Sequence, residues 1–221
     1  MNYIAERRLE EKERRRAEIL DAAEAVASQG TWDELTMDQV ARKARLSRAL
    51  VYVYFKDKED LLFGLGERAI LMLGQRFQEA VARNRRGLDQ VLAIGRAYIA
   101  FSQEFPVFFA VMARCEMVSQ NAQELDPNQE ACREGGNAVR ALIVAALETG
   151  IRDGSVRPDV GDLKTVAIVL WGFTFGVIQL AATKAKVLSQ DGIQGRQLME
   201  QTLLMAARSI AAGPQPPHTP P

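Results

Sequence analysis

The chain has 221 residues, of which 48% are hydrophobic and 25% are charged. That balance is typical of a soluble globular protein with one large domain or two modest ones. Its 28 basic and 28 acidic side chains cancel. A polyanionic partner must therefore be argued from a local patch of charge and not from the net charge.

The histidine and cysteine counts exclude most catalytic and metal sites. The one histidine, His218, lies in the proline-rich residues 213–221, which we expect to be a disordered tail. A Ser-His, Cys-His or His-metal site would need a histidine in the body of the fold, so we expect no enzyme, no metal site and no cofactor. Cys115 and Cys132 form no CxxC pair. Residues 6–16 are charged where a signal peptide would be apolar, so we expect a cytoplasmic protein.

The repeated stretches rich in Ala, Leu, Glu, Arg and Gln, separated by short Gly or Pro signals, predict an all-α fold. We expect a DNA-binding domain over residues 13–73 and a second helical domain over residues 74–212. The helices are predicted at 6–29, 36–44, 48–55, 58–84, 88–104, 106–120, 127–153, 162–184 and 194–212.

Residues 165–183 carry no charge and include Gly172 and Gly176 at GxxxG spacing. This length is close to that of a membrane span, and GxxxG in an apolar helix can mark a transmembrane dimer. The alternative is a helix buried on most sides in a soluble protein. Interspersed threonine and glutamine residues and the amphipathic segment that follows favour this alternative.

Two short helices joined by a tight turn are predicted between residues 36 and 55, which is the spacing of a helix-turn-helix. Thr36 and Gln39 form a capping-box pattern at the start of the first helix, and Ser47 caps the second. Each cap is flanked by a hydrophobic staple: Leu35 with Val40, and Leu46 with Val51.

At 3.6 residues per turn, Val51 and Phe55 share the inward face of the second helix, while Ala49, Val53 and Lys56 point outward. Small apolar groups on an exposed face suit thymine methyls, and basic residues suit phosphates. A plain helical hairpin with a solvated basic face is the alternative. Against one acid, Asp57, residues 42–58 carry six basic residues: Arg42, Lys43, Arg45, Arg48, Lys56 and Lys58.

The N-terminal segment resembles the TetR family of transcriptional regulators, most densely over residues 14–67. The resemblance implies an all-helical homodimer with a DNA-binding head and a ligand-binding body. It is carried by Ile19-Leu20-Asp21-Ala22-Ala23, Gly30, Leu35-Thr36, Val40-Ala41, Ala44, Leu46-Ser47, Tyr52, Tyr54-Phe55, Lys58-Glu59 and Leu61-Leu62.

The resemblance also implies DNA contacts by position. The groove-facing places are occupied by Ser47, Arg48, Ala49, Leu50 and Val53, and the phosphate-contacting places by Thr36, Tyr52, Tyr54 and Lys58. Two residues depart from the family pattern. Arg45 replaces a glycine in the turn, which requires a left-handed backbone or an altered turn. Ala49 replaces a glycine, which should change base preference without abolishing binding.

For the body, the resemblance implies an apolar effector pocket and a dimer interface built from the two last long helices as a four-helix bundle. Core packing is the alternative role for each aromatic residue. The candidate pocket residues are Tyr98, Phe101, Phe105, Phe109, Met112 and Trp171. The candidate dimer residues are Trp171, Gly172, Phe175, Gly176, Gln179 and Leu203.

These features together predict a homodimeric repressor that a small apolar effector releases from a palindromic operator. An activator or a co-repressed regulator of the same fold is one alternative, and a helical-bundle enzyme is a more distant one. We expect no membrane partner. The alternating charges of residues 6–16 favour a solvated helix extension over an arm that contacts DNA.

Overall fold

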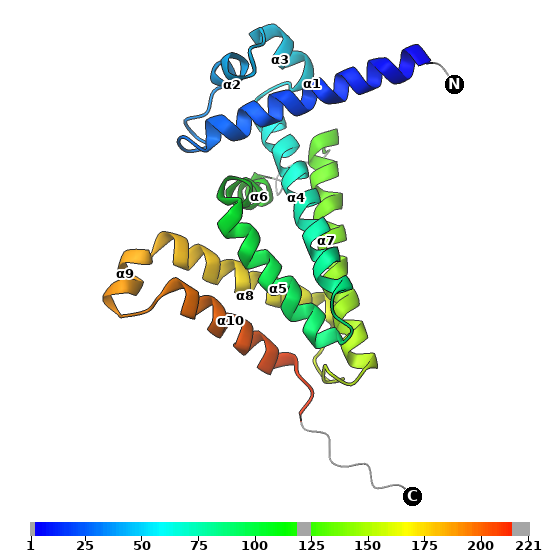
Figure 1. Ribbon diagram of the computed structural model, residues 1–221, viewed down its shortest axis with the longest axis vertical. Coiled ribbons are helices and arrows are strands. Elements are labelled where there is room, and N and C mark those ends of the chain that lie inside the picture. The colour runs from blue at the N-terminus through cyan, green and yellow to red at the C-terminus, as the bar shows by residue number, and fades with distance from the viewer. Residues whose placement is uncertain (1–2, 119–124, 214–221) are drawn as a thin grey trace, which may run out of the picture. The chain divides into compact units, whose positions relative to one another are not determined.

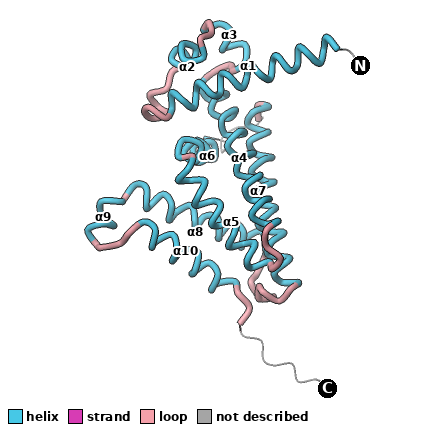
Figure 2. Tube along the Cα trace, in the orientation of Figure 1, coloured by secondary structure: helices cyan, strands magenta, loops and turns pink. Residues whose placement is uncertain are grey.

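The computed structural model describes residues 3–118 and 125–213, and this part of the chain contains ten helices and no β-sheet (Figures 1 and 2). The all-α prediction is therefore confirmed. The helices are α1 (Tyr3–Ala27), α2 (Met37–Ala44), α3 (Arg48–Tyr54), α4 (Lys58–Ala82), α5 (Gly87–Glu104), α6 (Pro106–Val118), α7 (Pro127–Arg152), α8 (Leu163–Thr183), α9 (Ala185–Gln190) and α10 (Gly195–Ile210).

Nine of these helices correspond to the sequence prediction, and α9 was missed. It has six residues, none of them buried, and no side-chain cap, so its sequence carries no helical pattern. The first helix ends at Ala27, earlier than predicted. The expected end of the sixth helix at residue 120 and the tail at 214–221 lie outside the described residues.

The chain divides into two compact units. Unit 1 comprises residues 1–71 and 105–135, and unit 2 comprises residues 72–104 and 136–221. By its contacts, segment 105–135 groups with the N-terminal helices. This pairing is decided by packing between residues distant in sequence, which local patterns do not report. The domain boundary predicted between residues 73 and 74 stays a prediction.

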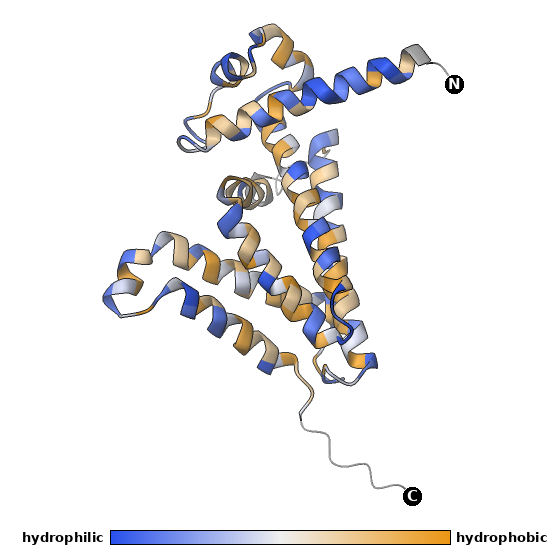
Figure 3. Cartoon of the chain, in the orientation of Figure 1, coloured by the Kyte–Doolittle hydropathy of each residue, from blue (hydrophilic) through white to orange (hydrophobic). Residues whose placement is uncertain are grey.

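Unit 1 has its core between α1, the two short helices and the first part of α4. Ile19, Val51, Phe55 and Leu61 are fully buried there. The first half of α1 is hydrophilic and its residues 5–14 are exposed (Figure 3). This is the pattern of a solvated helix.

Unit 2 is organised by α5, α8 and α10, which pack on one another. The start of α5 is capped from a distant loop, because the Gly87 amide donates to Asp153 Oδ2 at 2.8 Å and the Leu88 amide donates to Ser155 Oγ at 3.0 Å. A Cβ at Gly87 would lie 1.9 Å from the backbone nitrogen of Gly150. Only glycine permits this close approach of α5 and α7.

Helix α8 has one buried stripe and one exposed apolar face. Ala167, Leu170, Thr174 and Ile178 are its buried residues. Among the described helices it is the one whose length and mean hydropathy, 1.9, would suit a membrane span. Length and composition alone do not separate such a span from a helix that packs within a protein.

Candidate nucleic-acid interface and ligand pocket

The helix-turn-helix is built by the caps that the sequence predicted. The Gln39 amide donates to Thr36 Oγ1 at 3.3 Å, and the Thr36 amide donates to Gln39 Oε1 at 2.7 Å. Helix α3 begins in the same way, because the Leu50 amide donates to Ser47 Oγ at 3.2 Å. The capping box and the second cap are confirmed, and they fix where the two helices begin.

The turn between α2 and α3 is closed by a non-glycine residue in the left-handed region. Arg45 has φ 58° and ψ 38°. The next amide, that of Leu46, donates to the Ala41 carbonyl at 2.9 Å. Of the two turn geometries that the sequence left open, the structure has the left-handed one, which costs a non-glycine residue about 1–2 kcal/mol.

Helix α3 packs and exposes the residues that its periodicity predicted. Val51 and Phe55 are 0% exposed, while Val53 is 76% exposed and Tyr52 is 38% exposed. Ala49 is also exposed. An exposed helix face that carries valine, alanine and tyrosine is the kind of surface that major-groove recognition uses.

Arg48 is held in place on this face by two neighbours. Its Nε lies 3.1 Å from Asp38 Oδ1, and its guanidinium carbon lies 5.4 Å from the centroid of the Tyr52 ring. Its Nη2 also donates to the Tyr52 hydroxyl at 3.4 Å. The hydrogen bond with Tyr52 and the charge of Asp38 raise the pKa of Arg48.

Lys58 is engaged inside unit 1. Its ammonium donates to the Asp33 carbonyl at 2.9 Å and lies 5.8 Å from the centroid of the Trp32 ring. Burial, together with the nearby charge of Arg114, lowers the pKa of Lys58, although Asp33 acts in the opposite direction. Arg114 itself forms an ion pair with Asp33, with Nη2 and Oδ1 2.7 Å apart.

The remaining predicted DNA-contacting residues lie on the same surface to different extents. Thr36 and Ser47 are exposed, while Leu50 and Tyr54 are half-buried. Lys56, predicted to point outward, is exposed, but its ammonium is paired with Asp126. Sequence reasoning did not predict that pair, because its members lie 70 positions apart.

Unit 2 contains a small apolar cavity of about 40 Å³. Tyr98 and Trp171, both predicted to line a pocket, lie in its wall, where Trp171 Nε1 donates to the Tyr98 hydroxyl at 3.1 Å. Phe77, Ile143 and Leu203 also line it. No sequence signal distinguished these three from other core residues.

The other four pocket candidates do not line this cavity. Phe101 is fully buried in unit 2, and Phe105, Phe109 and Met112 belong to unit 1. Phe101, Phe109 and Met112 are buried, whereas Phe105 is half-buried. The cavity wall is formed instead by residues from five helices, so spacing within one helix did not identify it.

The dimer candidates divide between the outer face of α8 and the interior of unit 2. Gly172 and Gly176 lie on the outer face, where an added Cβ would meet no heavy atom within 4 Å. Leu203 lies within unit 2, since a Cβ at Gly95 would approach its Cδ2 to 2.7 Å. Phe175 and Gln179 are half-buried.

Two family models match the chain and together cover both functional regions. Residues 19–65 match the model described as bacterial regulatory proteins, tetR family. Residues 91–209 match the model described as tetracyclin repressor-like, C-terminal domain. The first match contains the helix-turn-helix, and the second contains α8 and all but the last residue of α10.

Individual proteins give the same result. The chain is 31% identical over 138 residues to the HTH-type transcriptional regulator BetI of Brucella anthropi, covering 61% of this chain and 68% of the relative. A protein of unknown function from Rhodococcus sp. RHA1 has the same fold, with a TM-score of 0.72 and 24% identity. The match covers 89% of this chain and 95% of that protein. The structure of the regulator FadR of Bacillus subtilis in complex with stearoyl-CoA matches with a TM-score of 0.65 and 16% identity. This match covers 88% of this chain and 98% of FadR.

Proposed function

Because the chain belongs to the TetR family of bacterial transcriptional regulators, we propose that it is a homodimeric repressor which a small apolar effector releases from a palindromic operator. The family consists of DNA-binding regulators and not of enzymes. The observation that carries the proposal is the outward face of α3, where Val53 is 76% exposed beside Tyr52 and Arg48 on a firmly capped helix.

Each subunit would place α3 in one major groove of the operator. In this position Arg48 reaches base edges, the small side chains of Ala49 and Val53 approach thymine methyls, and Tyr52 bonds a phosphate. Two such heads related by a two-fold axis select half-sites about one helical turn, roughly 34 Å, apart.

The outer face of α8 and α10 supports a homodimer. Ile168 is 44% exposed and Val169 is 62% exposed on α8, and Met205 is 52% exposed on α10. Exposing such apolar surface to water is unfavourable in free energy. Where the surface is contiguous, it marks an interaction site. Pairing these helices with their copies makes a four-helix bundle, with Gly172 and Gly176 allowing close approach.

The cavity at Tyr98 and Trp171 supports an apolar effector. A drug-sized ligand needs roughly 300–1,000 Å³, and the cavity holds about 40 Å³. Binding therefore requires its walls to move apart. An effector that favours the opened state and disfavours the DNA-bound state must weaken DNA binding, and DNA must weaken effector binding equally. We also propose that the protein acts in the cytoplasm, where operator DNA lies, and that it has no membrane partner.

Selection from random duplex DNA tests this proposal. Purified protein is incubated with the random library at moderate salt, and the retained duplexes are sequenced. We expect a palindrome with two half-sites about one helical turn apart. A library that remains unenriched in the presence of folded, dimeric protein would contradict the proposed repressor. A ligand that strengthens binding to the selected palindrome would instead assign a co-repressed regulator.

A further inference from the structure

Close after α3, the proposed recognition helix, the chain carries an exposed cation with an internal partner. Lys56 lies two positions after the last residue of α3, Tyr54, and its side chain is 54% exposed. Its ammonium donates to a carboxylate oxygen of Asp126, whose side chain is 43% exposed. Asp126 directly precedes α7, so a helix of the C-terminal half of the chain supplies the partner.

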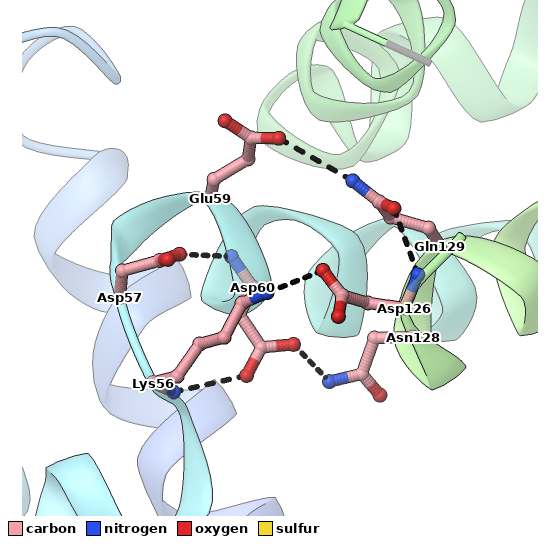
Figure 4. A network of polar contacts seen from close by, with 7 residues as sticks. All are labelled: Lys56, Asp57, Glu59, Asp60, Asp126, Asn128 and Gln129. Carbon is pink, nitrogen blue, oxygen red and sulfur yellow. Dashed lines mark hydrogen bonds and ion pairs between the residues drawn. The ribbon is translucent and has the colours of Figure 1, made fainter. Parts of the chain in front are cut away.

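The start of α7 is attached to the start of α4 by further hydrogen bonds (Figure 4). Asn128 Nδ2 donates to Asp60 Oδ1 at 2.7 Å, and Gln129 Nε2 donates to Glu59 Oε1 at 3.3 Å. Gln129 Oε1 in turn accepts from the Asp126 amide at 2.9 Å. Asp126 is therefore held opposite Lys56 by its own helix and does not meet it by chance.

The backbone of Lys56 is fixed by the same group of residues. Its amide donates to Asp60 Oδ2 at 3.0 Å, while the Asp60 amide donates to Asp57 Oδ1 at 2.7 Å. The hydrogen bond to Asp126, followed by the charges of Asp126, Asp57 and Asp60, raises the pKa of Lys56 although desolvation opposes this. The lysine is therefore charged and surrounded by acids.

A DNA phosphate and a carboxylate offer this ammonium the same kind of ligand, an anionic oxygen. The two anions compete for the single positive charge of the lysine, so pairing with the carboxylate weakens its attraction to a phosphate. Since both side chains of the pair are about half exposed, water and salt screen their attraction, and the pair exchanges readily.

We propose that Asp126 is a charge gate on the DNA-binding head: it holds the Lys56 ammonium in an internal ion pair, and Lys56 binds a DNA phosphate when that pair opens. The inference rests on the proposed DNA-binding function and adds a regulatory contact to it. Ile143 of α7, the helix that Asp126 directly precedes, lines the cavity. The gate thus lies at the start of an element that also faces the proposed effector site.

Binding to a short random-sequence duplex tests the gate, because a phosphate contact does not depend on sequence. Affinity is measured by fluorescence anisotropy between about 50 and 200 mM salt. Asp126→Asn should bind roughly three- to tenfold more tightly, and its log–log salt slope should steepen by about 0.9, the value for one added phosphate contact. The double variant Lys56→Gln/Asp126→Asn should lose both changes.

Glu130→Gln is the matched control. It removes the same charge from the first turn of α7, next to Asp126, but Glu130 Oε2 accepts from Arg133 Nε at 2.9 Å on its own helix. It should leave the salt slope unchanged. The gate is refuted if Asp126→Asn binds no more tightly than the wild type, or if its gain persists without Lys56. A wild-type protein that binds no duplex at any salt would instead refute the proposed function itself.

Discussion

Arg48 of the recognition helix is held by Asp38 of the preceding helix, with Nε and Oδ1 3.1 Å apart. The same guanidinium lies over the ring of Tyr52, one turn further along α3. These contacts restrict the rotamers of a long side chain before DNA arrives. Less conformational entropy would therefore be lost in the groove contact that we propose for Arg48.

Arg48→Ala should therefore relax sequence preference at one base pair of each half-site by roughly tenfold, the effect of losing one good base contact. The selected palindrome and its single-base variants provide the measurement. Lys43→Ala is the control, because Lys43 is an exposed cation on α2 outside the groove-facing set. It should weaken binding to all sequences evenly. An unaltered preference profile for Arg48→Ala would remove this residue from base recognition.

Arg45→Gly should raise the free energy of unfolding by about 0.5–1 kcal/mol. The left-handed backbone of Arg45 costs a non-glycine residue about 1–2 kcal/mol, which glycine would not lose. Because glycine has greater conformational freedom in the unfolded chain, part of this stabilisation is offset. Lys43→Gly, inside α2, should instead lower stability by about 1 kcal/mol. Chemical denaturation compares the two, and equal destabilisation by both glycines would contradict the strain at Arg45.

Val169→Arg should weaken dimerisation by at least about tenfold, because a two-fold interface would bury two like charges without partners. Val169 is 62% exposed on the outer face of α8. Leu71→Arg is the control, since Leu71 is similarly exposed, at 58%, on α4. Sedimentation velocity over a dilution series reports the oligomeric state. A dimer that Val169→Arg leaves intact would place the interface elsewhere.

The cap of α5 should make stability depend on acid pH. Hydrogen bonds from Ser155 and then from the Gly87 amide hold the pKa of Asp153 below its ordinary value. The stabilisation is therefore complete above the unfolded-state pKa, about 3.9, and is lost as the pH falls through the lower native value. Asp153→Asn should be less stable than the wild type at pH 7, and the difference should shrink below about pH 4.

Thermal denaturation over a pH series measures this dependence. Asp159→Asn is the control, because it removes the same charge from the same loop outside the α5 cap. Asp159 Oδ1 lies 3.9 Å from Arg157 Nε. This variant should show little of the pH-dependent loss. If both variants lose the same stability at every pH, the Asp153 cap does not carry the effect.

The sequence by itself determined the local structure of the DNA-binding head. Residues within one or two turns of each other set the capping pairs at Thr36 and Ser47 and the inward face of Val51 and Phe55. Interactions at such short separations leave a periodic pattern in the chain, so helix positions and faces were predictable. The six residues of α9 carry no such pattern, and that helix was missed.

The tertiary structure alone decided which side chains meet across the fold. It assigned Phe105 and Met112 to unit 1 and brought Phe77 and Leu203 to the cavity wall with Trp171. It also joined Lys56, which the sequence predicted only to point outward, to Asp126 across 70 positions. Contacts of this kind depend on how helices pack, and because packing accepts many apolar and charged partners, it leaves no spacing rule in the sequence.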